Sequence, residues 1–191
     1  MELSILIAGV GGQGTLLAAK IIGNAAIRAG LDAKVSEVHG MSQRGGSVVT
    51  YVRFADKPVA SPVIDEGRAD VVMAFEELEA YRSLTYLRRG GKMLVNTGHI
   101  LPMPVITGAA AYPGDIADKL KAAGCSVTAL DALALAREAG NEKAVNIILT
   151  GLLAAGLDFD KNLWIDVIKE TTPARFLDAN LAAFELGYNY N

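Results

Sequence analysis

Residues 9–14 have the spacing of a phosphate-binding turn. They read Gly9-Val10-Gly11-Gly12-Gln13-Gly14, a G-x-G-x-x-G pattern between an apolar run and a helical pattern. Glycines allow a tight turn and a close approach of backbone to an anion, and the free N–H groups at the helix start favour negative charge. A dinucleotide site also needs an acidic residue after the second strand, and Glu37, 23 residues beyond Gly14, is the candidate. The predicted cofactor-binding residues here are Gly9, Gly11, Gly12, Gln13, Gly14 and Glu37.

Two other interpretations of this turn stay open. The glycines could serve only the close packing of a helix on a strand. The Gln13 amide could equally bridge to another loop or to another subunit.

The densest group of reactive side chains lies at residues 36–46, Ser36-Glu37-Val38-His39-Gly40-Met41-Ser42-Gln43-Arg44-Gly45-Gly46. The Arg44 guanidinium can hold a phosphate or carboxylate in a planar fork, with backbone donors of the two following glycines nearby. His39 and Arg44 are candidate contributors to catalysis, since a histidine can exchange a proton near neutral pH. Further predicted cofactor-binding residues are Ser42, Gln43, Arg44, Gly45, Gly46 and Arg53, the last expected to join from the next strand. The alternative is a solvated hairpin tip with ordinary polar residues.

The elements that must hold these loops alternate between strand and helix. Predicted strands cover 3–8, 33–38, 48–54, 71–75, 92–96 and 126–130, and predicted helices cover 15–29, 76–87, 115–123, 132–139, 143–155, 160–170 and 174–186. No helix fits between residues 38 and 48, so the second and third strands are expected to be antiparallel neighbours. Residues 97–113 carry three prolines and are expected to form a loop, with a short extended piece at 105–106.

This order predicts one α/β domain over residues 1–191. We expect a Rossmann-like three-layer α/β/α fold with a mostly parallel sheet, an antiparallel insertion and a helical C-terminal third. We find no repeat and no linker that would divide it.

Composition narrows the classes of function. The net charge of −3 disfavours a nucleic-acid partner. Cys125 is the one cysteine and the two histidines do not follow a HExxH spacing, so neither an internal disulfide nor a cysteine-built metal site is expected. The apolar stretch at 144–157 is shorter than a membrane span, and no signal peptide is evident, so we expect no membrane partner and a cytoplasmic location.

Taken together, the two loops resemble those of the gamma subunits of 2-oxoacid:ferredoxin oxidoreductases. The similarity is greatest to the small subunit of the indolepyruvate type, and the segment 39–44 favours that type over the pyruvate and 2-oxoglutarate types. The carrying segments are 9–14 and 37–47, with weaker support from Asn146 and from Asn180, Phe184 and Gly187. The resemblance runs over essentially the whole chain.

The resemblance implies a small subunit of a complex that converts an arylpyruvate, coenzyme A and oxidised ferredoxin to an aryl-acetyl-CoA, carbon dioxide and reduced ferredoxin. Thiamine diphosphate, magnesium and 4Fe-4S clusters would lie on a larger partner subunit, because this chain lacks the motifs for them. This chain alone would hold no cofactor and be inactive. Its glycine loop and Arg44 suit the phosphates of coenzyme A.

Three alternatives stay open. The chain could be a gamma subunit for pyruvate or 2-oxoglutarate, a freestanding oxidoreductase that binds NAD(P) or flavin, or a scaffold without a ligand. An isolated chain could also form homo-oligomers through the surface left by its missing partner.

Overall fold

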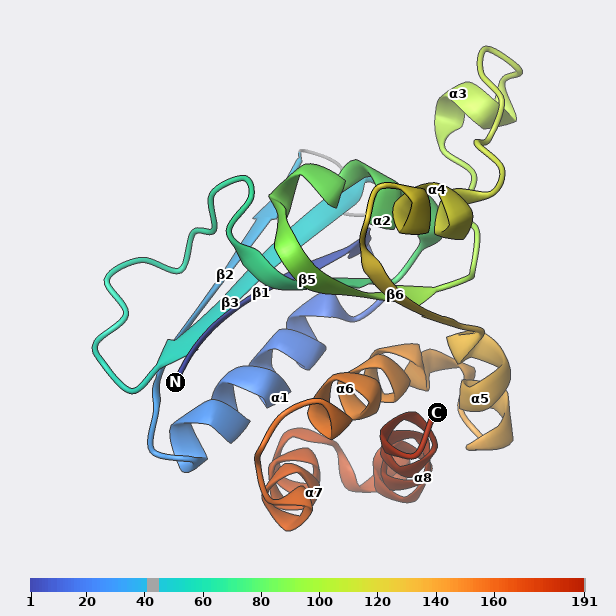
Figure 1. Ribbon diagram of the computed structural model, residues 1–191. Helices are drawn as coiled ribbons and strands as arrows, with labels where there is room; N and C mark the ends of the chain where they lie inside the picture. Colours follow the sequence, from blue (N-terminus) through green and yellow to red (C-terminus); the bar gives the residue numbers. More distant parts are fainter. Residues whose placement is uncertain (41–44, 191) are drawn as a thin grey trace.

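A six-stranded mixed sheet forms the centre of the computed structural model, which describes residues 1–40 and 45–190. The strands are β1 (Glu2–Val10), β2 (Asp32–His39), β3 (Ser47–Ala55), β4 (Ala69–Ala74), β5 (Leu87–Asn96) and β6 (Ser126–Leu130). Their order across the sheet is β2-β3-β1-β4-β5-β6 (Figure 1). β1, β4, β5 and β6 are parallel, whereas β3 is antiparallel to both of its neighbours. The predicted mostly parallel sheet with an antiparallel insertion is therefore confirmed.

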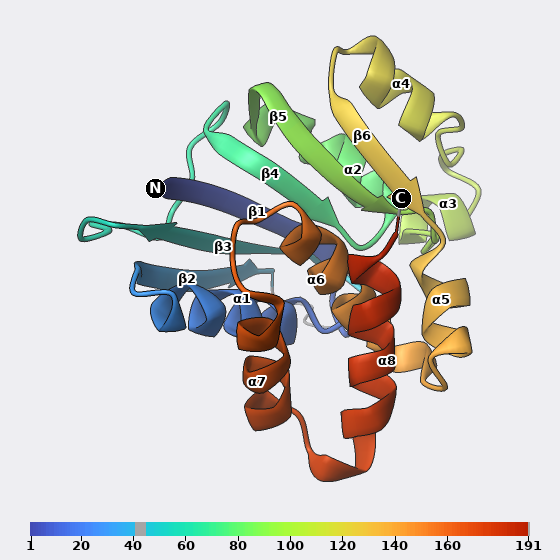
Figure 2. The ribbon, with the colours of Figure 1, turned by 60° about the horizontal axis from the view of Figure 1, so that its bottom comes forward.

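Helices cover both faces of the sheet. On one face lie α1 (Thr15–Arg28), α6 (Val145–Ala155), α7 (Lys161–Thr171) and α8 (Leu177–Tyr188), with α5 (Ala132–Glu138) beside them (Figures 1 and 2). On the other face lie α2 (Glu77–Arg82) and α4 (Ile116–Ala122). The β1 side chains alternate between two cores, Ile5 and Ile7 toward α1 and α6, Leu6 and Ala8 toward α2 and α4. This double burial explains the nearly continuous apolar sequence of β1.

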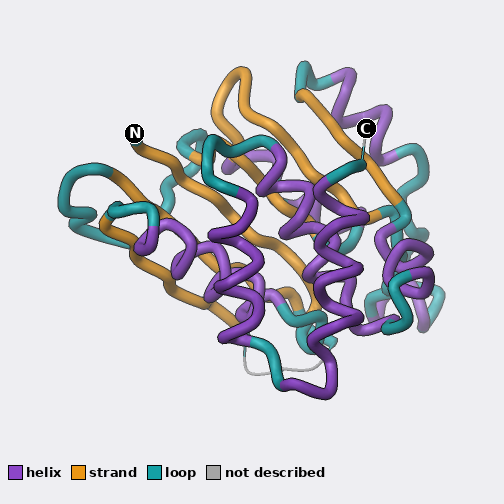
Figure 3. The backbone as a smooth tube through the Cα atoms, turned by 90° about the horizontal axis from the view of Figure 1, so that it is seen from below, coloured by secondary structure: helices purple, strands orange, loops and turns teal. Residues whose placement is uncertain are grey.

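The helical C-terminal third packs through two glycines. A Cβ on Gly187 of α8 would lie 2.0 Å from the Ile148 carbonyl oxygen of α6, and one on Gly151 of α6 would lie 2.4 Å from the Phe184 carbonyl oxygen. Only glycine allows the two backbones to approach this closely. Figure 3 shows these helices side by side under the sheet. Among the described residues, no helix is long and apolar enough to cross a membrane.

Two predicted elements differ from the structure. α2 ends at Arg82, not at residue 87, and Leu84–Tyr86 form a 3-10 turn that leads directly into β5. β5 starts early because Leu87 pairs with Ala69 before an irregularity brings Lys92 opposite Val71.

The second difference lies at residues 103–106. The short extended piece predicted at 105–106 is wrong, because Met103–Ile106 form the helical turn α3. Pro102 occupies its N-cap position and Pro104 lies in its first turn, where the missing N–H costs nothing.

Candidate functional site

The glycine loop follows β1 at the carboxyl edge of the sheet, the edge where parallel α/β proteins bind ligands. Gly12 and Gly14 have φ angles of 101° and 83°, which favour glycine. Gly14 is the N-cap of α1 and offers no side chain to the first helical N–H groups. The start of α1 therefore presents unsatisfied backbone donors next to this loop.

Gln13 points into the protein and holds the loop from within. Its Oε1 accepts from the Val10 N–H at 2.7 Å, and its Nε2 donates to the Phe75 carbonyl at 3.0 Å. The same carbonyl accepts from Asn96 Nδ2 at 2.9 Å, and Asn96 Oδ1 accepts from the Ala132 N–H at 3.0 Å. These bonds join the ends of β1, β4, β5 and the start of α5. This geometry agrees with the interpretation that the Gln13 amide bridges to another loop, here the connection after β4.

Asn146 holds the glycine loop from the helical side. Its Nδ2 donates to the Gly14 carbonyl at 3.3 Å, and a Cβ on Gly14 would lie 2.8 Å from that nitrogen. Asn146 is 4% exposed. The loop is thus preorganised by two side-chain amides, those of Gln13 and the buried Asn146.

Two hollows flank the glycine loop. The smaller, about 240 Å³, lies between the loop and the ends of β2 and β3, and it is lined by Gly11, Gly12, Gly14, Thr15, Leu16, Glu37, His39 and Val48. The larger, about 610 Å³, lies between the loop, the connection after β5 and the start of α6. We call it the edge crevice; its lining is Gly12, Gln13, Gly14, Asn96, Gly98, His99, Ile100, Leu133, Glu142, Lys143 and Val145. Its volume is in the range of small-molecule sites.

The structure brings part of the second predicted cluster to the glycine loop. Glu37 and His39 line the smaller hollow, and the Gly46 carbonyl accepts from the Gly11 N–H at 2.9 Å. Glu37 Oε2 also accepts from Thr50 Oγ1 at 3.4 Å, and His39 Nδ1 lies 3.0 Å from the Gly40 carbonyl. Gly45 adopts a φ of 75°. The predicted residues Ser42, Gln43 and Arg44 lie outside the described residues.

Glu37 does not occupy the position of a dinucleotide ribose partner in a simple Rossmann sheet. β3 lies between β1 and β2, so the carboxylate is on a strand about 10 Å from β1 instead of on its neighbour. The antiparallel insertion causes this separation, and it weakens the NAD interpretation of the glycine loop.

Arg53 does not join the second loop, and that prediction is wrong. The antiparallel register places Val48 opposite Gly9 but Arg53 opposite Ser4, so Arg53 lies at the far end of the sheet. Its guanidinium donates to the Ser61 carbonyl at 3.0 Å and to Glu2 Oε1 at 3.2 Å. The predicted strand 48–54 already places Arg53 about 17 Å from its start, at about 3.3 Å per residue, so strand length alone argues against this prediction.

Sequence reasoning missed a cluster of carboxylates that follows β4 at the carboxyl edge. Glu76 is 1% exposed and accepts from the Tyr112 hydroxyl, from the Ile100 N–H at 3.1 Å and from the Glu79 N–H at 2.9 Å. Burial and, next, the Glu76 carboxylate raise the pKa of Tyr112 above its usual value.

The neighbouring carboxylates are also paired. Glu79 accepts from Ser47 Oγ at 2.5 Å and from Arg82 at 2.6 Å, and Glu77 lies 2.7 Å from His99 Nε2. The available sequence signal was the run of three glutamates within four residues directly after a predicted buried strand.

These features define a class of protein: a Rossmann-like α/β domain whose rigid glycine loop, hairpin tip and crevice meet at the carboxyl edge. Residues 4–190 match the family model described as pyruvate ferredoxin/flavodoxin oxidoreductase, and the chain belongs to this family. Within the family, the chain is 44% identical to the indolepyruvate oxidoreductase subunit IorB of Thermococcus kodakarensis, with 97% of this chain and 94% of that protein covered.

Solved structures share the fold. The gamma subunit of a keto/oxoacid ferredoxin oxidoreductase from Geobacter sulfurreducens superposes with a TM-score of 0.71 at 25% identity, with 97% of this chain and 96% of that chain covered. The 2-oxoglutarate:ferredoxin oxidoreductase from Magnetococcus marinus gives a TM-score of 0.76 at 20% identity, with 98% of this chain covered. In that protein the matching part is 30% of a longer chain.

Proposed function

We propose that this chain is the small subunit of an indolepyruvate oxidoreductase, a complex that oxidatively decarboxylates arylpyruvates to aryl-acetyl-CoA and reduces ferredoxin. The 44% identity to the Thermococcus kodakarensis subunit over nearly the full length of both proteins carries this proposal. The substrate is inferred from that relative, since nothing in the described lining of the crevice selects an indole ring.

Thiamine diphosphate, magnesium and the 4Fe-4S clusters belong, in this proposal, to a larger partner subunit. A four-iron cluster needs four thiolates, and this chain has only Cys125. Among the described residues, no three His, Cys, Asp or Glu side chains gather into a metal site. The residues present do not fit these groups, so the contribution of this chain is to bind and position.

The phosphates of coenzyme A are the proposed ligand of the glycine loop and the hairpin tip. Gly12 and Gly14 open the backbone at the start of α1, where its N–H groups favour an anion. Gly40 and Gly45 bracket the segment of Ser42, Gln43 and Arg44, and the Gly46–Gly11 hydrogen bond holds the end of this tip against the glycine loop. An arginine there would add a bidentate phosphate contact.

Reconstitution with the larger subunit tests the proposed function. We expect the complex to reduce ferredoxin and form a CoA thioester with indolepyruvate at a kcat/KM at least about tenfold above that with pyruvate or 2-oxoglutarate, a difference of about 1.4 kcal/mol. Equal or higher activity with pyruvate or 2-oxoglutarate would reassign the substrate.

The isolated chain distinguishes the alternative of a freestanding oxidoreductase. We expect no flavin absorbance and no change in nicotinamide fluorescence on titration with NADH or NADPH. A yellow protein, or saturable nicotinamide binding, would support that alternative instead. A cytoplasmic location stays a prediction.

A further inference from the structure

An uncharged arm projects from the carboxyl edge of the molecule. We call residues 98–114 the apolar arm; it contains α3 and extends beyond α4 in Figure 1. Charged residues make up 20% of the chain, yet residues 93–114 contain no Asp, Glu, Lys or Arg. A protruding surface segment without a single charged side chain is unusual for a part of a protein that only meets water.

The outer side chains of the arm are large, apolar and exposed. Met103 is 66% exposed, Ile106 61%, Leu101 49% and Ile100 38%. The other large exposed apolar residues are spread over several parts of the chain, and no other described segment carries more than two of them, as β2 does with Val35 and Val38. Apolar side chains gathered on one projecting segment are typical of a surface that another protein covers.

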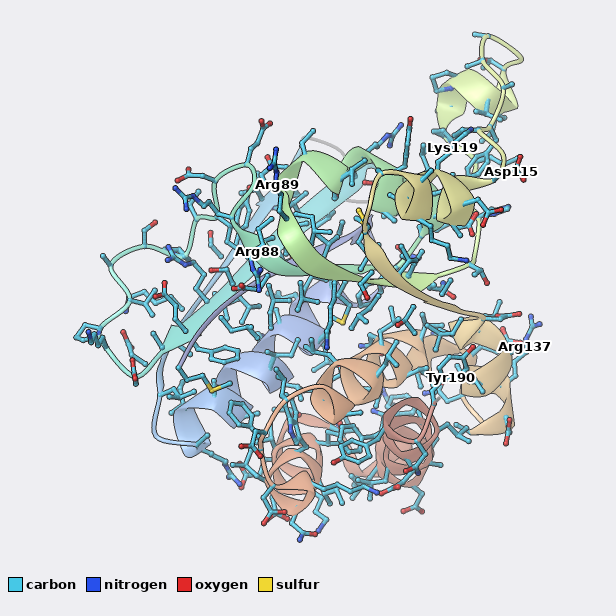
Figure 4. The ribbon with its side chains drawn as sticks, in the orientation of Figure 1. Arg88, Arg89, Asp115, Lys119, Arg137 and Tyr190 are labelled. Atoms are coloured by element: carbon cyan, nitrogen blue, oxygen red, sulfur yellow. The ribbon has the colours of Figure 1, made fainter. Side chains whose placement is uncertain are left out.

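The base of the arm is held firmly, as a preformed docking element requires. Glu76 accepts hydrogen bonds from Ile100 at one end of the arm and from Tyr112 near the other. At the far end Lys119 donates to the Gly114 carbonyl at 2.7 Å, next to Asp115 with a φ of 54° (Figure 4). A rigid segment loses little conformational entropy on association.

The arm is continuous with the candidate site. Gly98, His99 and Ile100 belong to the arm and also line the edge crevice opposite the glycine loop. A protein that covers the arm therefore also meets this crevice.

We propose that the apolar arm is the docking element for the larger subunit of the complex, an inference that rests on the proposed function. In that function coenzyme A binds at the carboxyl edge and must reach the cofactors of the partner, and the arm extends from this edge. Because the arm carries no charge, the surface of the larger subunit that receives it is expected to be neutral and apolar. A charged surface there would lose its hydration without gaining an ion pair from the arm.

Binding of the larger subunit to arm variants tests the inference. We expect Met103→Asp and Ile106→Asp each to weaken association at least about 30-fold, since each places a charge in an apolar contact. Met103→Leu should bind within about threefold of the unchanged chain, because it keeps the apolar volume. The matched control is Val63→Asp, an exposed valine outside the arm, which should also change binding less than about threefold.

Melting temperatures of all variants establish that each one folds. If the unchanged chain binds the larger subunit and both aspartate variants bind equally well, the inference is wrong while the proposed function stands. If the aspartate variants only abolish self-association of the isolated chain, a second copy covers the arm and the inference is wrong. Failure of the unchanged chain to bind the larger subunit would overturn the proposed function itself.

Discussion

The two ends of the sheet use polar groups in opposite ways. At the amino end, a hollow of about 510 Å³ is lined by Glu2, Ser4, Arg53, Val63, Ile64, Asp65, Gly67, Arg68, Asp70 and Arg88. Two ion pairs cross it: Arg53 pairs with Glu2 at 3.2 Å, and Arg88 with Asp70 at 2.5 Å. At the carboxyl end, buried amides and carboxylates hold backbone loops in place, and the projecting apolar arm carries exposed apolar side chains.

This difference shows that the candidate functional site is not the region with the most charged side chains. The ion pairs at the amino end lie at the surface, where ion pairs contribute little to stability. The buried amides and carboxylates at the carboxyl end hold the backbone loops in position. The helix N–H groups, the crevice and the apolar arm stay available to other molecules. Substitutions of the same type at the two ends of the sheet test this difference.

The largest difference is expected for the two glutamates. Glu76→Ala should lower the free energy of unfolding by about 3 kcal/mol, because the N–H groups of Ile100 and Glu79 and the Tyr112 hydroxyl lose a buried acceptor. Glu2→Ala, at a side chain that is 69% exposed, should cost less than about 0.5 kcal/mol. Chemical denaturation of both variants measures the two values. Equal losses would mean that the carboxyl-end network is not the stabilising one.

Two glycines with similar backbone angles give the next comparison. Gly14 and Gly90 have φ angles of 83° and 74°, so alanine should cost about 1 kcal/mol of strain at either position. A Cβ at Gly14 also meets buried Asn146 at 2.8 Å, whereas one at Gly90 finds its nearest neighbour at 4.0 Å. Gly14→Ala should therefore destabilise by about 2 kcal/mol and Gly90→Ala by about 1 kcal/mol, as measured by thermal unfolding. The reverse order would contradict the close contact of Asn146 with the loop.

The smallest effect is a pH dependence at the carboxyl end. The pKa of Tyr112 is raised in the folded state above its usual value of 10.0, so the unfolded chain releases this proton first as the pH rises. The free energy of unfolding contributed by Tyr112 is complete below pH 10 and declines above it, by at most about 1.4 kcal/mol per pH unit. Tyr112→Phe should remove this slope; denaturation at pH 9, 10 and 11 compares the two chains. If the free energy of unfolding changes with pH in the same way in both chains, the pKa of Tyr112 is not raised by folding.

Local patterns were sufficient to predict most of the fold. The apolar run of β1, the glycine loop and the helices of the C-terminal third were all predicted because each depends on residues close together in the sequence. The antiparallel pairing of β2 and β3 was predicted from the lack of room for a helix.

Features that depend on distant residues were missed. The partner of Glu76, Tyr112, lies 36 residues further along the chain. α3 spans only four residues, too few for a helical period to be recognised. The preorganisation of the candidate site therefore could not be derived from sequence patterns, although its glycine loop could.

The antiparallel strand β3 has a consequence for how this family can diversify. Because β2 and β3 are antiparallel neighbours, β2 ends and β3 begins at the same edge as the glycine loop, and residues 40–46 connect them there. Nine residue pairs fix β3 against β1, from Glu2–Ala55 to Val10–Ser47, and none of them includes the tip. Insertions and deletions between these two strands can therefore accumulate without a change in sheet register, while the rest of the domain is inherited intact.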